Sequence, residues 1–143
     1  RFALGSAVLI HNMSVLLSFF LLSFLYRSLG AMIALGWNAS VWAITLTLLA
    51  GEGIARAENP VLYTLTIIVA IMPHLVVEAA AYLVGSLSAI FLSRGITLYA
   101  ISNPLLKRVL TAVFVLAIAS VVLIIFGALL ESNYAPRMLG LAY

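Results

Sequence analysis

The run from Val61 to Ser93 constrains the fold most, because Glu78 is the only charged residue within it. As one straight helix this run would be about 50 Å long, whereas the hydrocarbon core of a bilayer is about 30 Å thick. Pro73 lies inside the run, where a proline removes a backbone donor and clashes with the carbonyl four residues earlier. We therefore expect either one kinked helix or a half-helix over 61–71 followed by a full helix over 73–93.

Three further apolar runs, at 2–26, 30–50 and 109–130, are long enough to cross a bilayer. The chain is 66% hydrophobic and 8% charged, whereas about 25% of the residues in a soluble domain are charged. The runs lack the alternation of apolar and polar residues that is typical of outer-membrane barrel strands. The sequence therefore predicts an all-α, polytopic transmembrane helix bundle with four or five membrane segments and a Pro-broken helix at 71–74. We expect a single domain over 1–143 in the lipid bilayer, as a multi-pass protein of a cell membrane.

Two connectors are expected between these runs. Residues 51–60 contain two carboxylates, glycines and a closing Asn59-Pro60, which predicts an aqueous loop followed by a helix start. A second connector is expected to begin at Arg94-Gly95 and to reach Lys107 and Arg108. If 61–93 crosses the membrane once, Arg94, Lys107 and Arg108 lie on the same side of the membrane as Arg27. The positive-inside rule then makes that side cytoplasmic. If 61–71 were instead a re-entrant half-helix, the membrane orientation of every segment after it would be reversed.

The amino-acid composition and the absence of known catalytic motifs disfavour several classes of function. Its seven basic residues give a net charge of +3 but are scattered, so we do not expect nucleic acid as a partner. The chain has no cysteine, so a metal site would have to use histidine and carboxylate ligands. No nucleophile elbow, metalloprotease motif or phosphate loop is present, and we expect no enzymatic activity. Because the chain starts at Arg1, we interpret it as a fragment or a processed product.

His74 and Glu78 are the central candidate residues. They lie four positions apart and so share one face of a helix. An ionised group at the centre of a membrane helix costs about 2.5 kcal/mol or more, so both side chains should face protein. One interpretation is a buried, hydrogen-bonded pair that fixes helix packing. The other is a proton or metal site in which both bind a divalent transition ion such as zinc, with His11 or Glu131 as the third ligand.

Other polar residues are expected to form a structural network with this pair. The stripe of His11, Ser14 and Ser18 should face other helices. Asn12 and Asn38 are each predicted to form a hydrogen bond with a residue of another helix. Glu131 at the end of the last helix should need a partner, because the negative end of the helix dipole disfavours a carboxylate there.

Two rows of small residues predict close helix packing, namely Gly30 with Ala34, and Ala81 with Gly85 and Ala89. We expect one of these rows to support a homo-oligomer, most simply a two-fold dimer.

The chain resembles the stage II sporulation protein M family of integral membrane proteins. The resemblance is carried by Asn12, Gly30, Gly36-Trp37-Asn38, Pro73-His74-x-x-x-Glu78 and Ala128-Leu129-Leu130-Glu131. Leu75 and Ala39 stand where the family usually has glycine. The resemblance implies a non-enzymatic membrane scaffold or assembly component with protein partners in a membrane complex. The alternative is a small carrier or ion-binding membrane protein with a His/Glu metal site, since broken helices commonly line ion sites in transporters.

Overall fold

The computed structural model describes residues 2–55 and 57–140, so residues 1, 56 and 141–143 of the predicted domain lie outside the described part. Within that part, the chain folds into four α-helices, which are α1 (Phe2–Tyr26), α2 (Ser28–Ile54), α3 (Pro60–Leu98) and α4 (Pro104–Gly140). Each helix contains a stretch that is long and apolar enough to cross a membrane. The predicted all-α bundle is therefore confirmed, and the chain is a multi-pass membrane protein.

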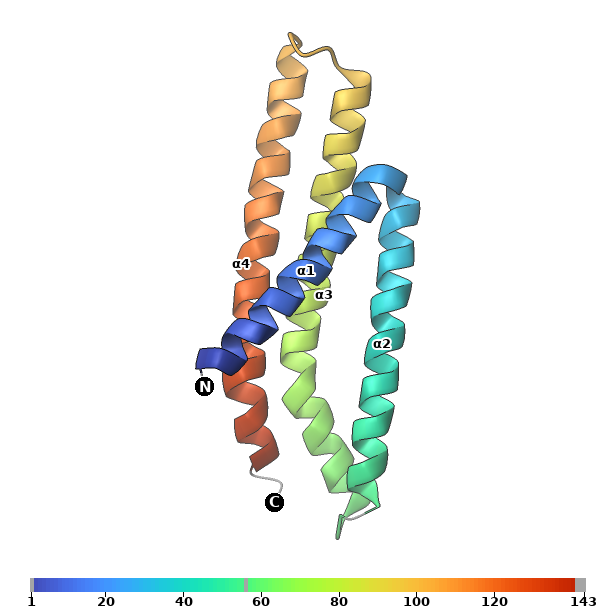
Figure 1. Cartoon of the computed structure of the whole chain (residues 1–143), viewed down its shortest axis with the longest axis vertical. Helices are drawn as coiled ribbons and strands as arrows, with labels where there is room; N and C mark the ends of the chain where they lie inside the picture. Colours follow the sequence, from blue (N-terminus) through green and yellow to red (C-terminus); the bar gives the residue numbers. More distant parts are fainter. Residues whose placement is uncertain (1, 56, 141–143) are drawn as a thin grey trace.

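The helices α3 and α4 form a long antiparallel hairpin, and α1 crosses this hairpin obliquely (Figure 1). The helix α2 packs against α1 and α3, and its described residues do not contact α4. The turns between α1 and α2 and between α3 and α4 lie at the same end of the molecule, where the α3–α4 hairpin projects further (Figure 1). Arg27, Arg94, Lys107 and Arg108 therefore share one end.

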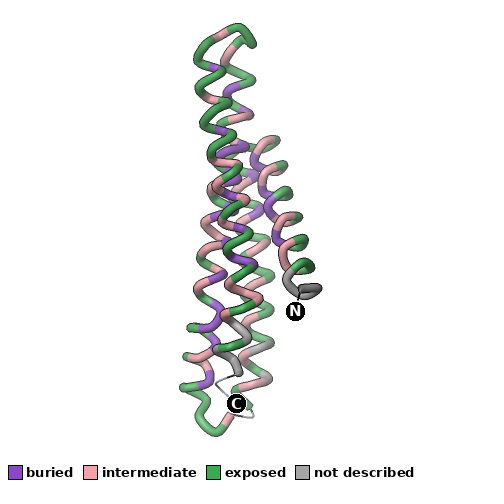
Figure 2. Tube along the Cα trace, turned by 90° about the vertical axis from the view of Figure 1, so that its left-hand side faces the viewer, coloured by how far each residue is buried: buried purple, intermediate pink, exposed green. Residues whose placement is uncertain are grey.

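The core lies where α1 crosses α3 and α4. Its buried hydrophobic residues come from all four helices, namely Leu16, Phe19, Ala34, Ala81, Tyr82 and Ile124. The rings of Phe19 and Tyr82 stack with their centroids 4.7 Å apart. Figure 2 shows that the buried positions face the neighbouring helices, whereas exposed positions cover the outside. The outward-facing positions are largely apolar, as expected where lipid takes the place of water.

The helix α3 is continuous through Pro73, so the chain is not interrupted at 71–74 and no separate half-helix is formed. Of the two predicted alternatives, the single helix is the one observed. Figure 1 shows the first part of α3 leaning toward α2, which is the kind of bend that an internal proline produces. Because α3 passes through the bundle once, residues 61–71 do not form a re-entrant half-helix. The membrane orientation of the later segments is therefore not reversed.

The bounds of α1 are the predicted ones, whereas α2, α3 and α4 are longer than predicted. The helix α2 extends to Ile54, into the expected loop, and α3 passes through Arg94-Gly95, so the second connector is confined to 99–103. The starts of α3 and α4 coincide with Asn-Pro pairs. The Asn59 side chain accepts a hydrogen bond from the Leu62 amide at 3.1 Å, which caps α3. The predicted spans ended at charged residues, which indicate where a helix leaves the bilayer. The helices α2, α3 and α4 continue past these residues, and α3 begins directly after its capping residue.

Candidate functional site

Glu78 lies at the centre of a buried polar cluster on α3. Its side chain is 2% exposed, and Asn12 of α1 donates a hydrogen bond from Nδ2 to Glu78 Oε1 at 2.5 Å. Asn12 is also buried. This bond joins two helices that cross in the core, and it gives the intramembrane carboxyl group the protein partner that such a group requires.

The helix α4 completes the cluster. A Cβ atom at Gly127 would lie 3.0 Å from Glu78 Cγ, so the missing side chain leaves the room that Glu78 occupies. Glu131 follows one turn later and is half-buried, and its carboxyl group is close enough to interact electrostatically with His74 and Glu78. Residues of α1, α3 and α4 therefore meet at one buried carboxyl group.

His74 has a different environment from Glu78. Its side chain is 3% exposed, and within the described chain its Nδ1 atom has no hydrogen-bond partner. Its ring centroid lies 5.7 Å from that of Trp42 on α2, with the planes tilted by 55°. No hydrogen bond between His74 and Glu78 is recorded among the described side chains, so the predicted hydrogen-bonded pair is wrong. Four residues advance a helix by about 400°, and the remaining offset of about 40° turns His74 toward α2 and Glu78 toward α1 and α4.

The predicted metal ligands are only partly brought together. His11 is exposed on α1, whereas Glu131 is half-buried on α4 and interacts electrostatically with His74 and Glu78. In the described part of the chain, no group of three or more His, Cys, Asp or Glu side chains is arranged to hold a metal ion. Structural and catalytic zinc sites use at least three protein ligands. Zinc binding by His74 and Glu78 therefore stays a hypothesis.

The polar stripe on α1 does not face other helices, so that prediction is wrong. His11, Ser14 and Ser18 are exposed, and each serine hydroxyl donates to the backbone carbonyl four residues earlier, at 2.9 Å for Ser14 and 3.0 Å for Ser18. Local bonds of this kind satisfy a hydroxyl without another helix. Asn38 of α2 is half-buried, and no interhelical hydrogen bond is recorded for it within the described residues.

Both rows of small residues lie inside the bundle. Gly30, Ala34, Ala81, Gly85 and Ala89 are all buried. A Cβ atom at Gly85 would lie 2.6 Å from the side chain of a core leucine of α1. The chain's own helices therefore already cover the two faces on which a dimer was expected, and a second copy would have to use another surface.

Sequence reasoning missed two contributions from the last helix. Gly127 lies in the most uniformly apolar run of the chain, yet it shapes the space around Glu78. The signal that could have identified it is its position one turn before Glu131. The backbone of α4 also contacts α3 further along the hairpin, where the buried Ser88 donates a hydrogen bond to the Val113 carbonyl at 2.9 Å. The contact at Gly127 makes α4 a structural part of the site, and the bond from Ser88 holds α4 against α3 outside it.

No family model, curated protein or solved structure matches the chain. Its family resemblance therefore rests on the sequence motifs alone. Chemically, the cluster is a carboxyl group held by an amide in a low-dielectric core, beside a histidine with a free ring nitrogen. Such an arrangement can fix helix packing, or it can hold a proton or a cation.

Proposed function

We propose that the chain is a non-enzymatic membrane scaffold that gathers other membrane proteins, as its resemblance to the stage II sporulation protein M family implies. The observation that carries this proposal is on the outward face of α2. Trp37 is 77% exposed, and it lies near the middle of the apolar span Ser28–Leu48. This position is unusual because tryptophan in membrane proteins prefers the two interfaces.

The indole N–H of Trp37 adds to the argument. Within the described residues no hydrogen bond is recorded for it, and an unsatisfied donor in hydrocarbon is costly. A helix of a partner protein would cover the ring and supply an acceptor. The position of Trp37 therefore favours a protein partner over lipid on this face.

Small residues next to Trp37 favour the same conclusion. Gly36 is exposed, and a Cβ atom there would meet nothing within 4 Å. Ser40 is also exposed and donates its hydroxyl hydrogen to the Gly36 carbonyl at 2.8 Å. A small-residue row of this spacing lets another helix approach closely. On α2 the row of Gly30 and Ala34 is used inside the bundle, whereas the row of Gly36 and Ser40 is open to a partner.

A photo-crosslinking amino acid in place of Trp37 tests the proposal in the native membrane. The matched control is Phe114 of α4, which is 66% exposed and also lies within a span. We expect a discrete protein adduct from position 37 and only lipid adducts from position 114. Lipid adducts alone at both positions would contradict a scaffold that works through this face.

A second candidate is a small carrier or ion-binding protein, which the free Nδ1 of the buried His74 favours. If Glu78 and Glu131 supplied the oxygen ligands, this mixture of nitrogen and oxygen donors would suit a transition ion such as zinc. At about pH 8, where histidine is neutral, zinc should raise the melting temperature of the wild type and of His11→Ala, but not of His74→Ala. An equal shift in all three proteins would place the metal elsewhere.

A further inference from the structure

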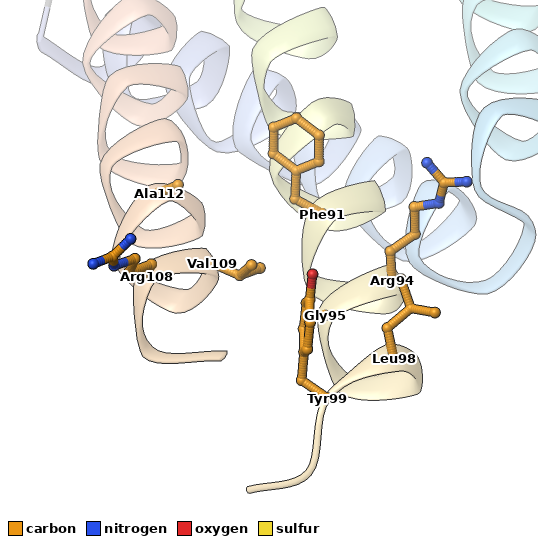
Figure 3. Close-up of a pocket in the computed structure, with 8 residues that line it drawn as sticks. All are labelled: Phe91, Arg94, Gly95, Leu98, Tyr99, Arg108, Val109 and Ala112. Carbon is orange, nitrogen blue, oxygen red and sulfur yellow. The ribbon is translucent and has the colours of Figure 1, made fainter. Parts of the chain in front are cut away.

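A cleft of about 360 Å³ opens between α3 and α4 near the turn that joins them (Figure 3). Its walls are apolar and consist of Phe91 and Leu98 from α3 and Val109 and Ala112 from α4. Gly95 brings the two helices together at this point, since a Cβ atom there would lie 2.8 Å from Val109 Cγ1. The volume lies within the range of small-molecule sites, about 300–1,000 Å³.

Two arginines add positive charge to this apolar cleft. Arg94 of α3 and Arg108 of α4 line it, and Figure 3 shows them on either side, with the ring of Tyr99 between them. Both arginines are exposed, and within the described chain no hydrogen bond or ion pair is recorded for either guanidinium group. The sequence has no acidic residue between Ala79 and Leu130. The chain therefore leaves this charge uncompensated, and the cleft is complementary to an anion that carries an apolar chain.

The depth of the cleft matches the phosphate level of a bilayer. Asn12 lies near the middle of α1 and is bonded to Glu78, which places Glu78 near the membrane centre. Arg94 follows Glu78 by sixteen residues, or about 24 Å along a helix, whereas the hydrocarbon ends about 15 Å from the centre.

We propose that this cleft binds an anionic phospholipid. The side chains of Arg94 and Arg108 are exposed and extend outward on opposite sides of the cleft (Figure 3), and both turn over the opening so that their guanidinium groups contact the headgroup phosphate. The glycerol and ester region of the lipid lies against Phe91 and Ala112, and the acyl chains continue from there into the hydrocarbon. Basic pockets between helices at this depth are suited to phosphate-bearing headgroups.

Native mass spectrometry of the full chain in mild detergent tests the proposal with phosphatidylglycerol and phosphatidylcholine of identical acyl chains. We expect the wild type to retain phosphatidylglycerol preferentially. Arg94→Gln combined with Arg108→Gln should weaken its binding about thirtyfold, the effect of two basic residues near an anionic surface. Lys107→Gln is the matched control, because Lys107 adjoins Arg108 but does not line the cleft. An equal loss in Lys107→Gln would overturn the site and indicate general surface charge.

Two further measurements separate a lipid from free phosphate. Ala112→Phe fills the apolar part of the cleft and keeps both arginines, and it should weaken phosphatidylglycerol binding while leaving the melting temperature in detergent alone unchanged. Ala112→Leu provides a smaller filling at the same exposed position. Inorganic phosphate should not displace the lipid. Full lipid binding by both filled variants, or displacement by inorganic phosphate, would overturn the assignment to a phospholipid.

Discussion

The hydrogen bond from Asn12 to Glu78 should be a main contact that holds α1 on the α3–α4 hairpin. Asn12→Leu removes the donor at similar volume and leaves a buried carboxyl group without its recorded partner, which should cost about 1–3 kcal/mol of unfolding free energy. Glu78→Met keeps the unbranched chain that fits against Gly127 and removes the acceptor. With both changes the site becomes apolar, and the double variant should lose less than the sum of the single losses.

The expected coupling energy follows from comparable bonds. Interhelical hydrogen bonds in membrane proteins contribute about 0.6 kcal/mol on average and about 1.7 kcal/mol at most. Because both groups are buried and the bond at 2.5 Å joins two helices, we expect a value in the upper part of this range. The assay is reversible unfolding of the four proteins of the cycle in mixed micelles of SDS and a mild detergent, followed by circular dichroism.

A matched control uses Asn38→Leu in place of Asn12→Leu. Asn38 is a half-buried asparagine on α2, with no hydrogen bond to Glu78. The losses from Asn38→Leu and Glu78→Met should add within about 0.5 kcal/mol, as for independent sites. If the Asn12 cycle is also additive within this error, the bond does not hold α1 in place, and the reasoning about the core fails.

Two glycine substitutions test close contacts elsewhere in the bundle. A Cβ atom at Gly30 would overlap the backbone carbonyl oxygen of Leu22, so Gly30→Ala should lower the melting temperature, whereas Gly36→Ala, which meets nothing within 4 Å, should leave it unchanged or raise it. Equal effects would show that α1 and α2 do not pack as closely as described. Gly127→Ala should cost about 1 kcal/mol because its Cβ would lie 3.0 Å from Glu78 Cγ, and a gain in stability would indicate that the carboxyl group lies elsewhere.

The sequence by itself determined the fold class. Hydrocarbon cannot hydrogen-bond a backbone, so a long apolar run must form a helix in order to satisfy its own N–H and C=O groups. The positions at which α3 and α4 begin, Pro60 and Pro104, were also determined by neighbouring residues alone. The asparagine before each proline accepts a hydrogen bond from a free amide of the first turn, without any distant partner. His74 and Glu78 were identifiable as buried residues because ionisable groups inside a span are costly to expose to lipid.

Only the tertiary structure decided which residues meet. On α1, one residue of rotation, about 100°, separates the exposed His11 from the buried Asn12, and an apolar helix surface gives little signal of which side faces protein. The sequence left open whether Pro73 interrupts or only bends the helix, and the structure shows one continuous helix. The role of Gly127 depended on α4 lying against Glu78, a contact between residues far apart in the chain. In a membrane, an apolar side chain can face either lipid or protein, so hydrophobic patterning alone does not show which face of a helix is buried. The buried faces are determined by how the helices cross.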